Sequence, residues 1–136
     1  TFWTTTMSST EIRHPDIEIY IKNRSLEQIL QWLRDRADSV ESHNSVGGTH
    51  SLTAIFSDQR IPVMIHEKAV GKAWISVWFR SDATPWIRDV DCAHEVATAL
   101  DTQVRCIVSG WQDGDDPDEW WKIEGGEIDK ITWRTD

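Results

Sequence analysis

The sequence predicts an α+β fold, in which an antiparallel sheet of about five to seven strands carries two helices on one face. Two observations support this class: short alternating or β-branched segments recur along the chain, and two longer segments have helical periodicity. The length of 136 residues fits one domain of ordinary size, and no internal repeat is evident. We therefore expect a flexible leader, rich in Thr and Ser, over residues 1–15 and a single domain over residues 16–136.

The amino-terminal part of the domain has the clearest periodicity. Ile17, Ile19 and Ile21 alternate with polar residues, which predicts a strand with one buried face. Ser25 and Gln28 have the spacing of a capping box, so a helix is expected to begin there. An apolar stripe at helical spacing continues this helix as far as residue 37: Leu26, Ile29, Leu30, Leu33 and Ala37.

The middle of the chain has the composition of a β meander. Residues 40–46 fit either an edge strand or a loop that leads to a Gly-Gly pair. Three short segments rich in β-branched or aromatic residues follow, separated by turn-like stretches: residues 52–56, 63–66 and 73–79. The last segment places Trp74 and Trp78 on one face and aliphatic side chains on the other. Because both of its faces are apolar, we expect this strand to be central in the sheet.

A second helix and three further strands are predicted in the carboxyl-terminal part. Pro85, Asp89 and Asp91 introduce the helix. Its inward stripe is mainly alanine, which allows close approach to a sheet: Ala93, Val96, Ala97 and Leu100. A Gly-Gly pair, which is a strong hairpin signal, joins the last two of the three strands: residues 104–108, 120–123 and 128–133.

Negative charge is concentrated in the last part of the chain. Residues 1–81 contain 9 acidic and 9 basic residues, whereas residues 82–136 contain 14 acidic and 5 basic ones, which gives the net charge of −9. Nucleic acid is excluded as a partner, since no cluster of Lys or Arg could replace the phosphate counterions. A basic protein is the partner that such a surface fits. The alternative is that the charge only keeps the protein soluble.

Tryptophan is the unusual residue of this chain, with nine copies. Large aromatic side chains beside charges are typical anchors of protein interfaces. We therefore predict a partner-binding site from the densest acids and the tryptophans around them: Trp111, Asp113, Asp115, Asp116, Asp118, Glu119, Trp120 and Trp121. At least one of the two adjacent tryptophans must point away from the core, because neighbours on a strand alternate. The alternative is that the rings only cover a sheet face that has no helices.

The sequence predicts no catalytic residue, no metal site and no cofactor. His94 and Glu95 begin a metalloprotease motif, but Thr98 stands where the second histidine is needed. Three other histidines could converge with an acid, which one sequence does not reveal: His43, His50 and His66. Cys92 and Cys106 are expected to be buried thiols. No segment resembles a membrane span or a secretory signal, so we expect a cytoplasmic protein without a membrane partner.

The layout resembles that of bacterial polymorphic-toxin immunity proteins of contact-dependent inhibition and type VI secretion systems. The resemblance covers residues 17–133 and is carried by the strand and capped helix EIYIKNRSLEQILQWL, the aromatic segment KAWISVWF and the closing strand IDKITW. It implies a small cytoplasmic protein that binds and blocks a cognate toxin domain.

Two other function classes stay open from the sequence. One is a ligand-binding or enzymatic domain whose concave sheet is lined by Trp74, Trp78 and a histidine. The other is a self-assembling domain, in which the carboxyl-terminal hairpin pairs across a two-fold axis to give a homodimer.

Overall fold

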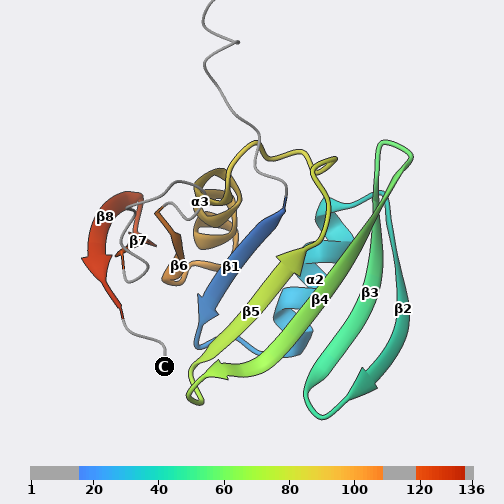
Figure 1. The fold of residues 1–136 in the computed structure, drawn as a ribbon, viewed down its shortest axis with the longest axis horizontal. Helices are drawn as coiled ribbons and strands as arrows, with labels where there is room; N and C mark the ends of the chain where they lie inside the picture. Colours follow the sequence, from blue (N-terminus) through green and yellow to red (C-terminus); the bar gives the residue numbers. More distant parts are fainter. Residues whose placement is uncertain (1–15, 109–118, 134–136) are drawn as a thin grey trace, which may run out of the picture.

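A computed structural model describes residues 16–108 and 119–133, which form one antiparallel sheet with two helices packed behind it (Figure 1). The predicted leader and residues 109–118 lie outside the described residues. The elements follow in this order: β1 (Ile17–Lys22), α2 (Leu26–Arg36), β2 (Ser39–Val46), β3 (Thr49–Phe56), β4 (Gln59–Val70), β5 (Trp74–Phe79), α3 (Asp89–Leu100), β6 (Val104–Ile107), β7 (Glu119–Glu124) and β8 (Glu127–Thr132).

The predicted fold class is confirmed, but the predicted number of strands is wrong. The sheet has 8 strands, in the order β2-β3-β4-β5-β1-β6-β7-β8. The additional strand is β2, which the sequence left open between an edge strand and a loop. It is a strand because it pairs with β3 along its whole length, from Ser39 opposite Ile55 to Val46 opposite Thr49. As predicted, β5 lies in the interior of the sheet, next to β1.

Both predicted helices are confirmed. At the start of α2, the Gln28 backbone N–H donates to Ser25 Oγ (3.2 Å), and the Ser25 N–H donates to Gln28 Oε1 (2.9 Å), so the capping box is formed. Helix α3 begins at Asp89, where the Arg88 N–H donates to the Asp91 carboxylate (3.1 Å). Each helix turns its apolar stripe toward the sheet, and none of the described helices is long and apolar enough to cross a membrane.

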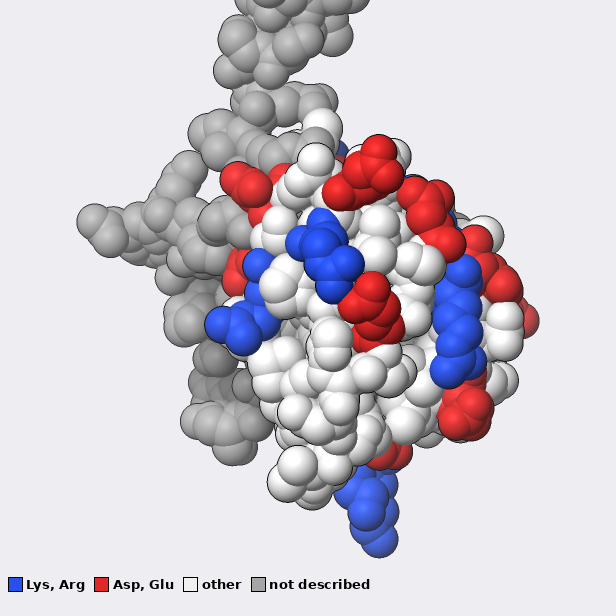
Figure 2. Space-filling model, turned by 90° about the vertical axis from the view of Figure 1, so that its right-hand side faces the viewer, with Lys and Arg blue, Asp and Glu red and all other residues white. Residues whose placement is uncertain are grey.

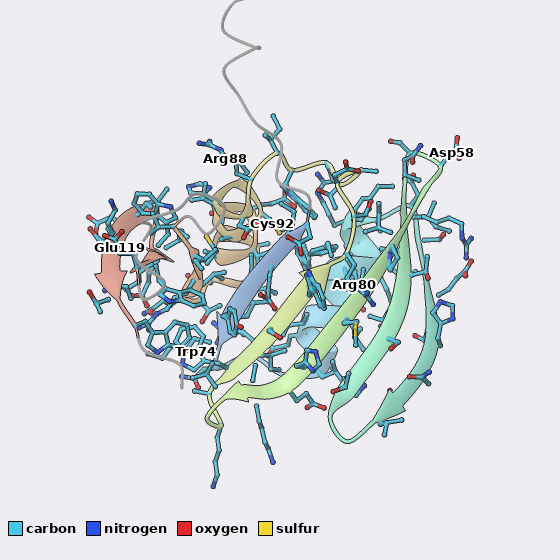
Figure 3. All side chains as sticks on the ribbon, in the orientation of Figure 1. Asp58, Trp74, Arg80, Arg88, Cys92 and Glu119 are labelled. Carbon is cyan, nitrogen blue, oxygen red and sulfur yellow. The ribbon has the colours of Figure 1, made fainter. Side chains whose placement is uncertain are left out.

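The core fills the layer between the helices and the sheet. Ile17, Ile19 and Ile21 of β1 are fully buried there, as their alternation predicts. Cys92, which lies between α3 and the sheet in Figure 3, and Cys106 are both buried and free. Burial raises the pKa of both thiols, so they remain protonated and act as small apolar side chains. No helix formed by the described residues covers the other face of the sheet, and we call it the open face.

Candidate functional site

The predicted partner-binding residues belong to the connection between β6 and β7. Trp111 and four aspartates (Asp113, Asp115, Asp116 and Asp118) lie outside the described residues, whereas Glu119, Trp120 and Trp121 are on β7. The two ends of the connection lie side by side, because the Val108 N–H donates to the Glu119 carbonyl (3.2 Å). The end of β6 and the beginning of β7 therefore lie at the same end of the sheet.

Further carboxylates from distant parts of the sequence lie at the same end of the sheet. Strands β1 and β6 are antiparallel, with Tyr20 opposite Arg105, so β1 begins where β6 ends. Asp16 and Glu18 stand at this beginning of β1, and Asp89 is the first residue of α3. We call Asp16, Glu18, Asp89 and Glu119 the acidic end; Figure 3 labels Glu119.

The carboxylates of the acidic end influence one another. Asp89 is only 4% exposed, and burial, together with the nearby charges of Asp16 and Glu18, raises its pKa to about 8. Burial and Asp16 also raise the pKa of Glu18. Both shifts show that burial and like charge act together on the carboxylates at this end.

Two of the described basic residues near the acidic end have partners of their own. Arg88 pairs with Asp91 (3.2 Å), and the Arg80 guanidinium lies over the Trp78 ring, 4.9 Å from its centroid. The Trp78 indole N–H donates to Asp16 (2.8 Å). The hydrogen bond from Trp78 holds Asp16 in place.

The two adjacent tryptophans of β7 point to opposite faces, as the alternation rule predicts. Trp120 lies on the open face and is 7% exposed, so it offers little free area to a partner. It belongs to an aromatic cluster, which we define as Tyr20, Trp74, Trp120 and Trp133. Neighbouring ring centroids in this cluster are 4.7 to 5.7 Å apart, a spacing typical of attractive ring contacts.

Arg105 lies within the aromatic cluster. Its guanidinium is 4.7 Å from the centroid of Trp74 and 4.4 Å from that of Trp133, and its Nε donates to Gln103 Oε1 (2.7 Å). Partial burial lowers the pKa of Arg105 from its usual value, although the group stays charged. Among the described residues, the buried Trp120 Nε1 has no hydrogen-bond acceptor. Rings and a cation thus cover this part of the open face, where the sheet has no helix.

Trp121 faces the other side of the sheet, toward α3. It lines a shallow apolar groove of about 290 Å³, and the Lys130 ammonium lies 5.5 Å from its ring centroid. The other residues that line this groove are Arg88, Val90, Ile107, Val108 and Ile128. Of the predicted tryptophans on β7, only Trp121 therefore has a partly exposed ring.

Sequence analysis missed a polar arrangement at the opposite end of the sheet. His50 Nδ1 lies 2.6 Å from Ser45 Oγ, and His50 Nε2 lies 2.8 Å from the Glu67 carboxylate. The first contact could have been predicted, because a two-residue turn at Gly47-Gly48 places residues 45 and 50 opposite each other. The contact with Glu67 depends on the pairing of β3 with β4, which local sequence does not specify.

Ser45 and His50 line a groove of about 380 Å³ between β2 and α2, which we call the β2 groove. Its remaining lining residues are Leu26, Glu27, Leu30, Ser42, His43, Asn44 and Leu52. Neither groove is lined by Trp74 or Trp78, the residues of the alternative ligand site. His43 and His66 each contact a threonine, Thr53 and Thr49, at 2.7 and 3.0 Å. Across the described residues, no group of three His, Cys, Asp or Glu side chains fits a metal ion.

Comparisons with known proteins found no family model that matches the chain, no similar curated protein and no similar solved structure.

Proposed function

We propose that this chain is a non-enzymatic binding protein that neutralises a basic protein partner, and that it acts as an immunity protein against a bacterial toxin domain. The observation that carries the proposal is the charge asymmetry, with 14 acidic and 5 basic residues over residues 82–136 against an equal number of each before them. The resemblance in layout to polymorphic-toxin immunity proteins supplies the kind of partner.

The arrangement of the described carboxylates supports this proposal. Asp16 and Glu18 add to the acids of the carboxyl-terminal part because β1 begins at the end of the sheet where β6 ends and β7 begins. Asp16 and Glu18 raise the pKa of Asp89, so the carboxylates at this end lie close enough to repel one another. Complementary potential of this kind raises association rates and selects among partners.

The mechanism would be occlusion of the toxin's working surface. Carboxylates would pair with the cations by which the partner binds its substrate or performs catalysis, and Trp121 would supply contact area. An interface of ordinary size, roughly 800 Å² on each partner, would cover both the acidic end and the connection between β6 and β7.

The test is the association rate with the protein encoded beside this chain, measured at low and high salt. We expect the rate to fall about tenfold as salt increases. At low salt, the double variant Asp115→Asn, Asp116→Asn should associate several-fold more slowly than the native chain. The matched control, Asp35→Asn with Asp58→Asn, changes the net charge equally but in the neutral half of the sequence, and should leave the rate unchanged. Equal rates for both double variants would contradict the proposal.

A hydrolytic activity is the second candidate, and the contacts of His50 favour it. Ser45, His50 and Glu67 form a hydroxyl–imidazole–carboxylate series, in which the imidazole could accept the hydroxyl proton during attack on an ester. An activated serine would react with a fluorophosphonate probe. We would then expect labelling that is lost in Ser45→Ala and reduced in His50→Gln. Absence of labelling in the native chain would exclude this candidate.

A further inference from the structure

Over its second half, the edge strand β2 has neither charged side chains nor proline, two of the features by which proteins protect a sheet edge. Its residues are exposed except for Val40, and Val46 is 74% exposed. Between Ser42 and Gly48 it contains no Lys, Arg, Asp, Glu or Pro. The other edge, β8, carries Glu127, Asp129 and Lys130 among six residues. Figure 2, which shows the side with β2 and β3, has charged side chains across its upper part, along its right-hand edge and at its bottom, and an uncharged area in its lower centre. Because charge and proline normally prevent strand addition, β2 is the edge of the sheet to which another strand can pair.

The register shows which backbone groups β2 offers. The Glu67 N–H donates to the Gly48 carbonyl (2.9 Å), so Gly48 points its carbonyl toward β4. Backbone groups along a strand point alternately to its two neighbours, so those of the next residue, Thr49, point toward β2. Following this alternation along β2, the backbone groups that point away from β3 belong to Val40, Ser42 and Ser45. The β-bulge at residue 43 separates Val40 and Ser42, which lie before it, from Ser45, which lies after it.

The layer beneath β2 is incompletely filled. On the side that faces α2, β3 contributes the buried residues Leu52, Ala54 and Phe56, whereas β2 contributes Val40, which packs against the core, and two small serines, Ser42 and Ser45. The small serines leave the β2 groove open, and Leu26 and Leu30 of α2 remain only partly buried along it. An additional strand beside β2 would point every second side chain toward this groove and complete the layer.

The geometry points to β2 as a docking edge for an extended segment of the partner protein, which pairs with Val40, Ser42 and Ser45 and inserts an aliphatic side chain into the β2 groove. This inference rests on the proposed function for the nature of the partner. Charge selects the occupant: Glu27 lines the groove without any Lys or Arg, so a segment with basic residues fits. A second copy of this chain, with its own charge of −9, fits less well.

The test uses a capped octapeptide in which lysine alternates with valine or isoleucine, titrated into the full chain labelled with nitrogen-15. We expect the amide signals of Val40, Ser42 and Ser45 to shift, and their hydrogen exchange to slow at least tenfold. A control peptide with glycine in place of valine and isoleucine has the same charge and should bind at least tenfold more weakly. Equal binding of the two peptides, or shifts centred on the acidic end or on β8, would overturn the inference.

Two variants make the test specific for the edge. Ser42→Pro removes an outward N–H and leaves the ladder with β3 intact, and it should weaken binding of the lysine-valine peptide at least tenfold. Thr132→Pro, at an outward position of β8, is the matched control and should bind within twofold of the native chain. Leu30→Lys, at a partly buried position that lines the groove, places a cation there and should weaken binding as strongly as Ser42→Pro. Undiminished binding to both Ser42→Pro and Leu30→Lys would overturn the inference.

Failure of this inference can be separated from failure of the proposed function. If the peptide does not bind β2 but the Asp115 and Asp116 variant slows association with the partner, the docking edge is wrong and the proposed function stands. If the peptide binds β2 but partner association is insensitive to charge, the proposed function is wrong.

Discussion

The two edges of the sheet, β8 and β2, are built by different means. Around β6, β7 and β8, aromatic rings and Arg105 cover the open face, and the outer strand carries three charged residues, Glu127, Asp129 and Lys130. Around β2, the strand is held by its hydrogen bonds to β3 and by polar contacts such as that between Ser45 and His50. The difference shows where this fold is stabilised by burial and where it keeps polar backbone accessible. Regions with few buried side chains are those that open or rearrange most easily.

The largest expected effect comes from the aromatic cluster. Trp74→Ala removes a side chain that is 8% exposed and contacts both Arg105 and Trp133, so the free energy of unfolding should fall by about 3 kcal/mol. Chemical denaturation measures this loss. Val46→Ala, at the exposed end of β2, is the comparison and should cost less than about 0.5 kcal/mol. Similar losses of stability at the two positions would remove the distinction between the two edges of the sheet.

Asp89 should give the next largest effect, through pH. Because its pKa is raised to about 8 in the folded chain, the folded state holds this proton more tightly than the unfolded state. The stability that this group contributes is therefore complete below about pH 4, is lost as the pH rises to about 8, and changes no further above that.

The variant Asp89→Asn should remove this dependence and raise the free energy of unfolding at pH 8 by on the order of 2 kcal/mol. Denaturation at pH 5 and pH 8 measures it, with the exposed Asp129→Asn as control. A native chain that is more stable at pH 8 than at pH 5, with no gain in Asp89→Asn, would contradict this prediction.

A smaller effect is expected at the turn between β7 and β8. Glu124 and Glu127 are directly opposite each other beside Gly125-Gly126, and like charges in this position repel. Glu127→Lys converts the repulsion into attraction and should stabilise the chain by about 0.5 kcal/mol, whereas Glu127→Gln should give about half as much. Thermal unfolding at low salt detects this gain, and high salt should reduce it. A loss of stability in Glu127→Lys would show that the pair is not repulsive.

Features set by neighbouring residues could be predicted from the sequence, and features set by long-range pairing could not. The capping box of α2 and the Gly125-Gly126 hairpin depend on signals within a few residues, and both are confirmed. The sequence does not distinguish a strand from a loop over β2, because both faces of this segment are polar. Only its pairing with β3 identifies it as a strand.

The candidate site divides in the same way. Glu119 was predicted from local charge, but Asp16 and Glu18 join it only because β1 pairs with β6, more than 80 residues away in the sequence. Glu67 likewise reaches His50 only through the register of β3 and β4. The predicted contributions of Trp111 and Asp113 remain predictions, because they lie outside the described residues.

The central claim is that the protein recognises a basic partner by charge at the acidic end and by strand pairing at β2. Hydrogen exchange, measured for the chain alone and in complex with its isolated partner, tests this claim. In the free chain, Ser42 and Ser45 should exchange fast. In the complex, their exchange should slow at least tenfold, the Glu119 region should also be protected, and the outward amides of β8 should be unchanged. Protection of β8 with unchanged exchange at Ser42, Ser45 and Glu119 would contradict the account.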